Sequence, residues 1–142
     1  MANDIVTFRR SINDWIDSVT EGVELIVEGT LTKAANDIVK LSPVDTGRFR
    51  GNWQATGNAP AAQSLNNYDQ DGGETRNALR RQIAALSRDR NTNIIYLSNR
   101  LDYAQGLEFG SSNQAPNGVL GIVQQRLGRY FSEAVQEAKR AL

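Results

Sequence analysis

The residues whose types could do chemistry are few, and the most suggestive is the triplet Asp45-Thr46-Gly47. The same triplet carries the catalytic carboxylate of aspartic proteases, where two such carboxylates share a proton. Here it occurs once and precedes Arg48 and Arg50, whose charges would keep Asp45 ionised. We therefore expect a turn, in which the Asp45 side chain accepts backbone N–H groups and Gly47 supplies a positive φ.

Histidine and cysteine are both absent from the 142 residues. Their absence removes thiolate nucleophiles, disulfides, zinc sites of the usual Cys/His kind and catalytic triads that depend on imidazole. Gly72 and Gly73 precede a helical pattern, as in a phosphate-binding loop, but the lysine and Ser/Thr of that motif are missing. The sequence predicts no enzyme, no cofactor and no bound metal.

Carboxylates are dense in one place only, here named the acidic stripe: Asp14, Asp17, Glu21, Glu24 and Glu28. Spaced three and four residues apart, they lie on one face of a helix, opposite its apolar residues. No basic residue occurs between positions 11 and 32 to neutralise them. A stripe of this kind is typical of a surface that faces water or a partner, and not of a convergent acid–base or metal site.

Arginine outnumbers lysine thirteen to three, and six arginines, here named the arginine set, are concentrated in one segment: Arg76, Arg80, Arg81, Arg88, Arg90 and Arg100. Arginine forms bidentate pairs with carboxylates and phosphates, so the set could dock against another subunit, grip DNA or form a solvated helix surface. Sixteen basic and sixteen acidic residues give zero formal net charge. No long-range field therefore steers the chain toward nucleic acid or anionic lipid.

The first element that positions these residues is a long helix. Apolar residues recur at helical spacing from Asn3 to Leu41, and Ser42-Pro43 ends the pattern. Its apolar positions include Ile5, Phe8, Ile12, Trp15, Ile16, Val19, Val23 and Ile26. Such a helix is about 55 Å long, more than a small domain needs to cover its own core, so part of it should project.

The remaining patterns predict short elements. They are a strand at 51–56, a flexible loop at 57–73, a helix at 74–86, a strand at 93–98, helical turns at 102–108 ended by Gly110, a loop at 111–117 and a last helix at 118–142. Two strands are too few for a stand-alone sheet, so 57–73 is a candidate third strand.

The fold class is α+β, with one domain over residues 1–142: a long N-terminal helix (1–41), a small antiparallel sheet and two further helices, the last of them C-terminal. No apolar run approaches the roughly 18 residues of a membrane span, and the chain starts without the pattern of a signal peptide. We expect no membrane partner and synthesis in the cytosol.

Two segments carry a family resemblance: LSPVDTGRFRGNW at 41–53 and YAQGLEFGSSNQAPNG at 103–118. They resemble the neck or tail-completion proteins of long-tailed bacteriophages, the group that includes minor tail protein Z of phage lambda. In that family the first segment follows a long helix and the second precedes the last helix, as they do here. The resemblance covers the layout of the whole chain.

The resemblance implies a structural virion protein at the head–tail junction, assembled in the cytoplasm of the host bacterium. It implies a ring of six subunits, or twelve at the head side, that completes the tail and allows its attachment to the DNA-filled head. The implied partners are further copies and other neck, tail-terminator or head-completion proteins. DNA would pass through the channel without specific binding, and no catalytic residue or cofactor transfers.

The candidate subunit-interface residues come from these segments, the arginine set and the acidic stripe. They are Asp45, Arg48, Arg50, Trp53, Arg80, Arg81, Tyr103, Glu108, Gln114, Pro116, Asp14, Asp17, Glu21, Glu24 and Glu28. We expect Glu108 to pair with an arginine and loop 111–117 to be displayed. We expect the acidic stripe either to meet the arginine set of a neighbouring subunit or to line the channel of the ring.

Two rival functions stay open. A tail terminator that caps the tail tube belongs to the same structural class, and its position along the virion would distinguish it. A DNA-binding module that uses the arginine set belongs to another class, and the salt dependence of binding would reveal it.

Overall fold

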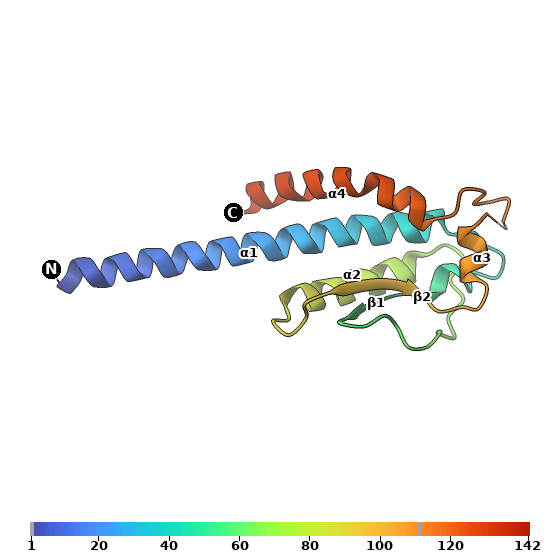
Figure 1. Cartoon of the computed structure of the whole chain (residues 1–142), viewed down its shortest axis with the longest axis horizontal. Helices are drawn as coiled ribbons and strands as arrows, with labels where there is room; N and C mark the ends of the chain where they lie inside the picture. The colour runs from blue at the N-terminus through green and yellow to red at the C-terminus, as the bar shows by residue number, and fades with distance from the viewer. Residues whose placement is uncertain (1, 111) are drawn as a thin grey trace.

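One helix sets the length of the molecule. The computed structural model describes residues 2–110 and 112–142, with side chains at residue 14 and from residue 16 onward, so Trp15 and the apolar positions before it lie outside the described side chains. Helix α1 (Ala2–Leu41) runs from one end of the molecule to the other (Figure 1), as its periodicity predicted. It ends just before Ser42-Pro43, and the Ser42 hydroxyl donates a 2.7 Å hydrogen bond to the Ile38 carbonyl.

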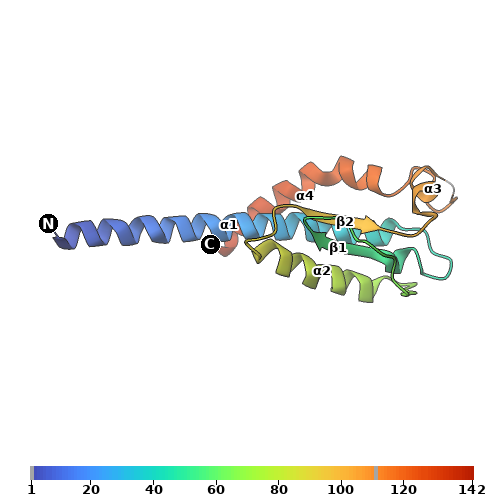
Figure 2. The ribbon, with the colours of Figure 1, turned by 60° about the horizontal axis from the view of Figure 1, so that its bottom comes forward.

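Two helices lie along the C-terminal half of α1, on different sides of it: α2 (Gly73–Arg88) and α4 (Leu120–Ala141) (Figure 1). Helices α1 and α4 approach closely, since a Cβ built on Gly29 would lie 3.1 Å from the Cβ of Ala134. A Cβ on Gly22 would lie 3.2 Å from the Leu142 side chain, so the C-terminal end of α4 lies beside this glycine. The N-terminal part of α1 therefore projects beyond both helices (Figure 2), as predicted.

The hydrophobic core lies where these helices and the sheet meet. Helix α1 contributes Ala34, Ala35, Ile38 and Val39, while α2 contributes Leu79 and Ile83, and α4 contributes Val123 and Tyr130. These positions follow the three-and-four spacing of helix faces, which is why periodicity identifies the buried side of each helix.

The sheet has two antiparallel strands, β1 (Trp53–Gly57) and β2 (Ile95–Asn99), with Trp53 opposite Asn99 and Gly57 opposite Ile95. Within the described residues the segment after β1 supplies no third strand. Helix α2 supports the sheet instead, and the Gln82 side chain accepts a 3.1 Å hydrogen bond from the backbone N–H of Ala55. The four α-helices and this sheet confirm the α+β class.

Side-chain amides hold the long loop between β1 and α2 against the short 3₁₀ helix η1 (Arg50–Asn52). Asn52 is fully buried, donates to the Arg48 carbonyl at 2.6 Å and accepts from the Leu65 N–H at 2.6 Å. Asn67 donates to the Gly51 carbonyl at 3.0 Å. These bonds replace the strand pairing that the loop lacks.

The short helix α3 (Ala104–Glu108) lies at the predicted helical turns, and Gly110 follows it with φ +88°. In this conformation a Cβ at position 110 would collide with the Pro116 carbonyl oxygen. The glycine is therefore required both for the left-handed backbone and for the close approach of the two loop ends.

We expect Gly110→Val to lower the free energy of unfolding by at least about 2 kcal/mol, because valine disfavours positive φ and its Cβ has no room. Urea denaturation measures the change. Asn113→Ala, at an exposed position of the same loop, should change it by less than about 0.5 kcal/mol. A Gly110→Val protein as stable as the parent would contradict the backbone argument.

Candidate functional site

The segment 41–53 closes the C-terminal end of α1 through Arg50. Its guanidinium donates hydrogen bonds to the carbonyls of Lys40 at 3.2 Å and Ser42 at 3.0 Å, and a third to the Gln70 carbonyl at 2.7 Å. The last carbonyls of a helix have no partners within the helix and carry partial negative charge, so a cation is stabilised there. Arg50, a candidate subunit contact, is thus engaged within its own chain.

Trp53 is the second anchor of this segment. It is 6% exposed, and its indole N–H donates a 2.8 Å hydrogen bond to the Ser42 hydroxyl. The Phe49 ring meets it edge-on, with ring centroids 5.6 Å apart. Trp53 therefore belongs to the core of this chain and fixes the turn after α1.

The Asp45-Thr46-Gly47 turn differs in part from the prediction. Gly47 has φ +86° as expected, and a Cβ there would lie 2.6 Å from the Asp69 backbone. The side chain that accepts a backbone N–H is Thr46, from Arg48 at 3.3 Å, and the described structure gives the exposed Asp45 carboxylate no such bond. Nor does it pair Asp45 with Arg48 or Arg50, because Arg50 is turned toward the end of α1.

Glu108 caps the N-terminal end of α4, so the expectation that it pairs with an arginine is wrong. Its carboxylate accepts backbone N–H groups from Val119 at 2.9 Å, Leu120 at 2.8 Å and Gly121 at 2.9 Å. Partial burial raises the pKa of Glu108, but these three hydrogen bonds outweigh it, and the pKa lies below its ordinary value of 4.5. The partners are backbone groups at a positive helix end, which take the place of an arginine.

Gln114 joins the two segments. Its side-chain amide donates to the Val44 carbonyl and accepts from the Val44 N–H, each at 2.9 Å. Beside this contact lies a hollow of about 210 Å³, here named the junction hollow, whose lining includes Asp45, Arg48, Tyr103 and Gln114. Four candidate residues from two distant segments therefore meet at one place, while Pro116 is exposed nearby in the sequence and does not line the hollow.

The acidic stripe divides into an exposed and a paired part. Asp14, Asp17 and Glu21 are exposed on the projecting part of α1, and Glu24 is half-buried. Glu28 forms an ion pair with Arg88 of α2, with 3.1 Å between Oε2 and Nη2. One member of the stripe and one of the arginine set are therefore partners within the chain.

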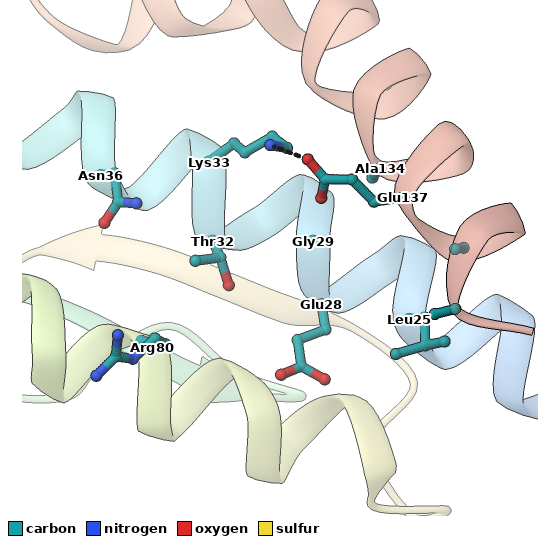
Figure 3. A pocket seen from close by; sticks show the side chains of 11 residues that line it. Leu25, Glu28, Gly29, Thr32, Lys33, Asn36, Arg80, Ala134 and Glu137 are labelled. Atoms are coloured by element: carbon teal, nitrogen blue, oxygen red, sulfur yellow. Dashed lines mark hydrogen bonds and ion pairs between the residues drawn. The ribbon is translucent and has the colours of Figure 1, made fainter.

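The remaining arginines of α2 are spread over its surface. Arg80 and Arg81 are both exposed, and Arg80 borders a hollow of about 410 Å³ between α1, α2 and α4 (Figure 3). Arg76 and Arg80 also line a smaller neighbouring hollow with Asn36. The candidate residues Arg80 and Arg81 do not line the junction hollow, so they are not part of the same site.

Sequence reasoning missed a polar link between α1 and α4. Lys33 bridges Glu137 at 2.8 Å and Glu133 at 3.5 Å, and the hydrogen bond to Glu137 raises the Lys33 pKa more than burial lowers it. Asp37 accepts hydrogen bonds from the Tyr130 hydroxyl and from Arg126, the latter at 3.2 Å. Burial, followed by the bond to Asp37, raises the Tyr130 pKa.

The described residues include no group of three or more Asp, Glu, His or Cys side chains placed to hold a metal ion. None of their helices is long and apolar enough to cross a membrane. Comparison with protein-family models, curated proteins and solved structures found no match. The site is therefore interpreted from its own geometry, which consists of helix caps, one junction and exposed faces.

We expect Glu108→Gln to lower the free energy of unfolding by about 1–2 kcal/mol at pH 7, because the amide loses the charge and one acceptor at the start of α4. A depressed pKa means that the carboxylate contributes fully above its ordinary value of 4.5 and loses its contribution as the pH falls through the folded value. The difference between the two proteins should therefore shrink in urea denaturation at about pH 3. Glu21→Gln, on the projecting part of α1, is the control and should leave the free energy of unfolding unchanged both at pH 7 and at about pH 3. A difference that stays constant with pH would contradict the capping role.

Proposed function

We propose that this protein is a structural component of the head–tail junction of a long-tailed bacteriophage, where copies form a ring that completes the tail and lets it join the DNA-filled head. The observation that carries the proposal is the projecting part of α1. It displays both acidic and apolar residues, and no other element of the described chain covers it. A ring subunit needs such free surfaces, because each copy must offer two unlike faces to its neighbours.

The positions of segments 41–53 and 103–118, which carry the family resemblance, support the proposal. One holds the C-terminal end of α1 through Arg50, the other holds the N-terminal end of α4 through Glu108, and Gln114 ties them together. Both segments thus fix the directions of α1 and α4. Such a role suits a structural protein that works by binding other subunits.

The DNA-binding alternative has weaker support from the arginine set. Arg88 is paired with Glu28, while Arg76 and Arg80 line a hollow between helices, so these residues do not form one continuous basic face. Binding to phosphates falls steeply with salt. A filter-binding titration that shows DNA retained at moderate salt would favour the alternative.

The proposal predicts that the protein is present in mature virions at the junction of head and tail. Gold labelling of a tagged copy, or its location in a density map of the particle, tests this directly. Infection with a phage that lacks the gene should leave DNA-filled heads and unattached tails, and the gene supplied in trans should restore joining. Virions without this chain would contradict the proposal, whereas a label on the ends of free, otherwise complete tubes would favour the tail terminator.

Charge reversal distinguishes the two placements of the acidic stripe. If the stripe meets the arginine set of a neighbouring subunit, Glu21→Lys with Glu24→Lys should block assembly, and Arg80→Glu with Arg81→Glu should restore it. If the stripe lines the channel, particles should assemble but eject DNA poorly, because the added cations attract the passing phosphates. Particle counts by electron microscopy and a DNA-release assay measure the two effects. Normal assembly with normal ejection would contradict both placements.

A further inference from the structure

An uncharged groove, here named the apolar groove, lies along the pair of helices α1 and α4. It has a volume of about 500 Å³, and its lining includes Ile26, Val27, Thr30, Leu31, Leu127 and Phe131. The Thr30 hydroxyl already donates to the Ile26 carbonyl at 2.7 Å, so it does not need a partner from outside. Leu127 and Phe131, one turn apart on α4, are 46% and 53% exposed, so the groove presents large apolar side chains to solvent.

The apolar groove continues outward as an exposed apolar stripe on α1. Ile16, Val19 and Val23 are between 45% and 55% exposed, although they share a helix face with Ala34 and Ile38 of the core. The face of α1 that is buried at Ala34 and Ile38 is thus exposed at these three residues. The sequence extends the same spacing back to Ile12, Phe8 and Ile5.

We propose that the apolar groove binds the projecting part of α1 from a second copy of this chain. An amphipathic helix that enters an apolar groove presents anchors at i, i+3 and i+7, and Ile16, Val19 and Val23 have this spacing. No other element of the described residues packs on the projecting part, whereas most of the stability of a protein helix comes from tertiary packing of its apolar face. Docking in a second copy supplies the packing that it lacks.

Charge also favours this occupant. The acidic stripe lies on the face of α1 opposite the apolar stripe, so docking buries apolar side chains and leaves the carboxylates in water. The groove lining has no charged side chain, so it does not suit DNA or the acidic stripe itself. Zero formal net charge means that copies do not repel each other at long range.

Each copy carries one projecting helix and one apolar groove. The contact joins two unlike surfaces, so a copy that gives its helix to one neighbour can accept a helix from another, which builds a ring or a filament. The inference deepens the proposed function by naming the contact within the ring. The inference rests on the proposed function only for the number of copies in the ring; the contact itself is argued from the groove and the helix.

The test is sedimentation velocity of the full-length protein over a series of concentrations. The parent should associate as its concentration rises. A groove variant, Phe131→Glu, and a helix variant, Val19→Glu, should each associate at least tenfold more weakly, because each places a charge in the contact. The matched controls Ser132→Glu and Ser18→Glu add the same charge on other faces of the same helices and should associate like the parent. Circular dichroism verifies that each variant folds.

An equal mixture of the groove and helix variants gives the decisive result. The groove variant keeps an intact helix and the helix variant an intact groove, so the mixture should form a one-to-one dimer and nothing larger. A parent that stays monomeric up to its solubility limit overturns the inference. So does a mixture that stays monomeric, or association that Phe131→Glu blocks and Val19→Glu does not, since grooves would then meet each other. These results concern solution association alone, whereas virion labelling tests the proposed function separately.

Discussion

A mismatch in helix length governs this structure. Helix α1 has 40 residues, whereas the two helices that pack along it, α2 and α4, have 16 and 22. With a rise of about 1.5 Å per residue, α1 is about 60 Å long and its partners are about 24 Å and 33 Å long. The chain can therefore bury only one half of α1, and the core, the sheet and all the loops gather around that half (Figure 1).

The two loop segments at the buried end solve the same electrostatic problem with opposite charges. The C-terminal end of α1 presents free carbonyls, which the Arg50 guanidinium binds, and the N-terminal end of α4 presents free N–H groups, which the Glu108 carboxylate binds. Each cap comes from outside its helix, so it fixes the path of a loop as well as the helix end. Gln114 then joins the two loops through its paired hydrogen bonds to Val44, which links the two capped ends.

Sequence patterns predicted the elements well because helix and strand periodicity is a local signal. The span of α1, its end at Ser42-Pro43 and the positive φ of Gly47 all follow from neighbouring residues. Glu108 was misassigned because its partners are backbone N–H groups, which every residue type except proline carries and which leave no mark in the sequence. The contacts between α1 and α4 were missed for another reason: Lys33 and Glu137 are 104 residues apart, and nothing local couples them.

The projecting part of α1 carries apolar side chains and charged side chains on separate faces, whereas many protein surfaces mix the two. Its apolar face can lose water without burying a charge, and burial of apolar area is the main source of association free energy. Its acidic face stays exposed when the apolar face is covered, and exposed charges contribute more to the rate and register of association than to its strength. Within the acidic stripe, Glu28 is paired with Arg88 of the folded body, whereas Asp14, Asp17 and Glu21 are exposed on the projecting part. In the proposed contact between copies, one face of this helix supplies affinity and the opposite face supplies orientation.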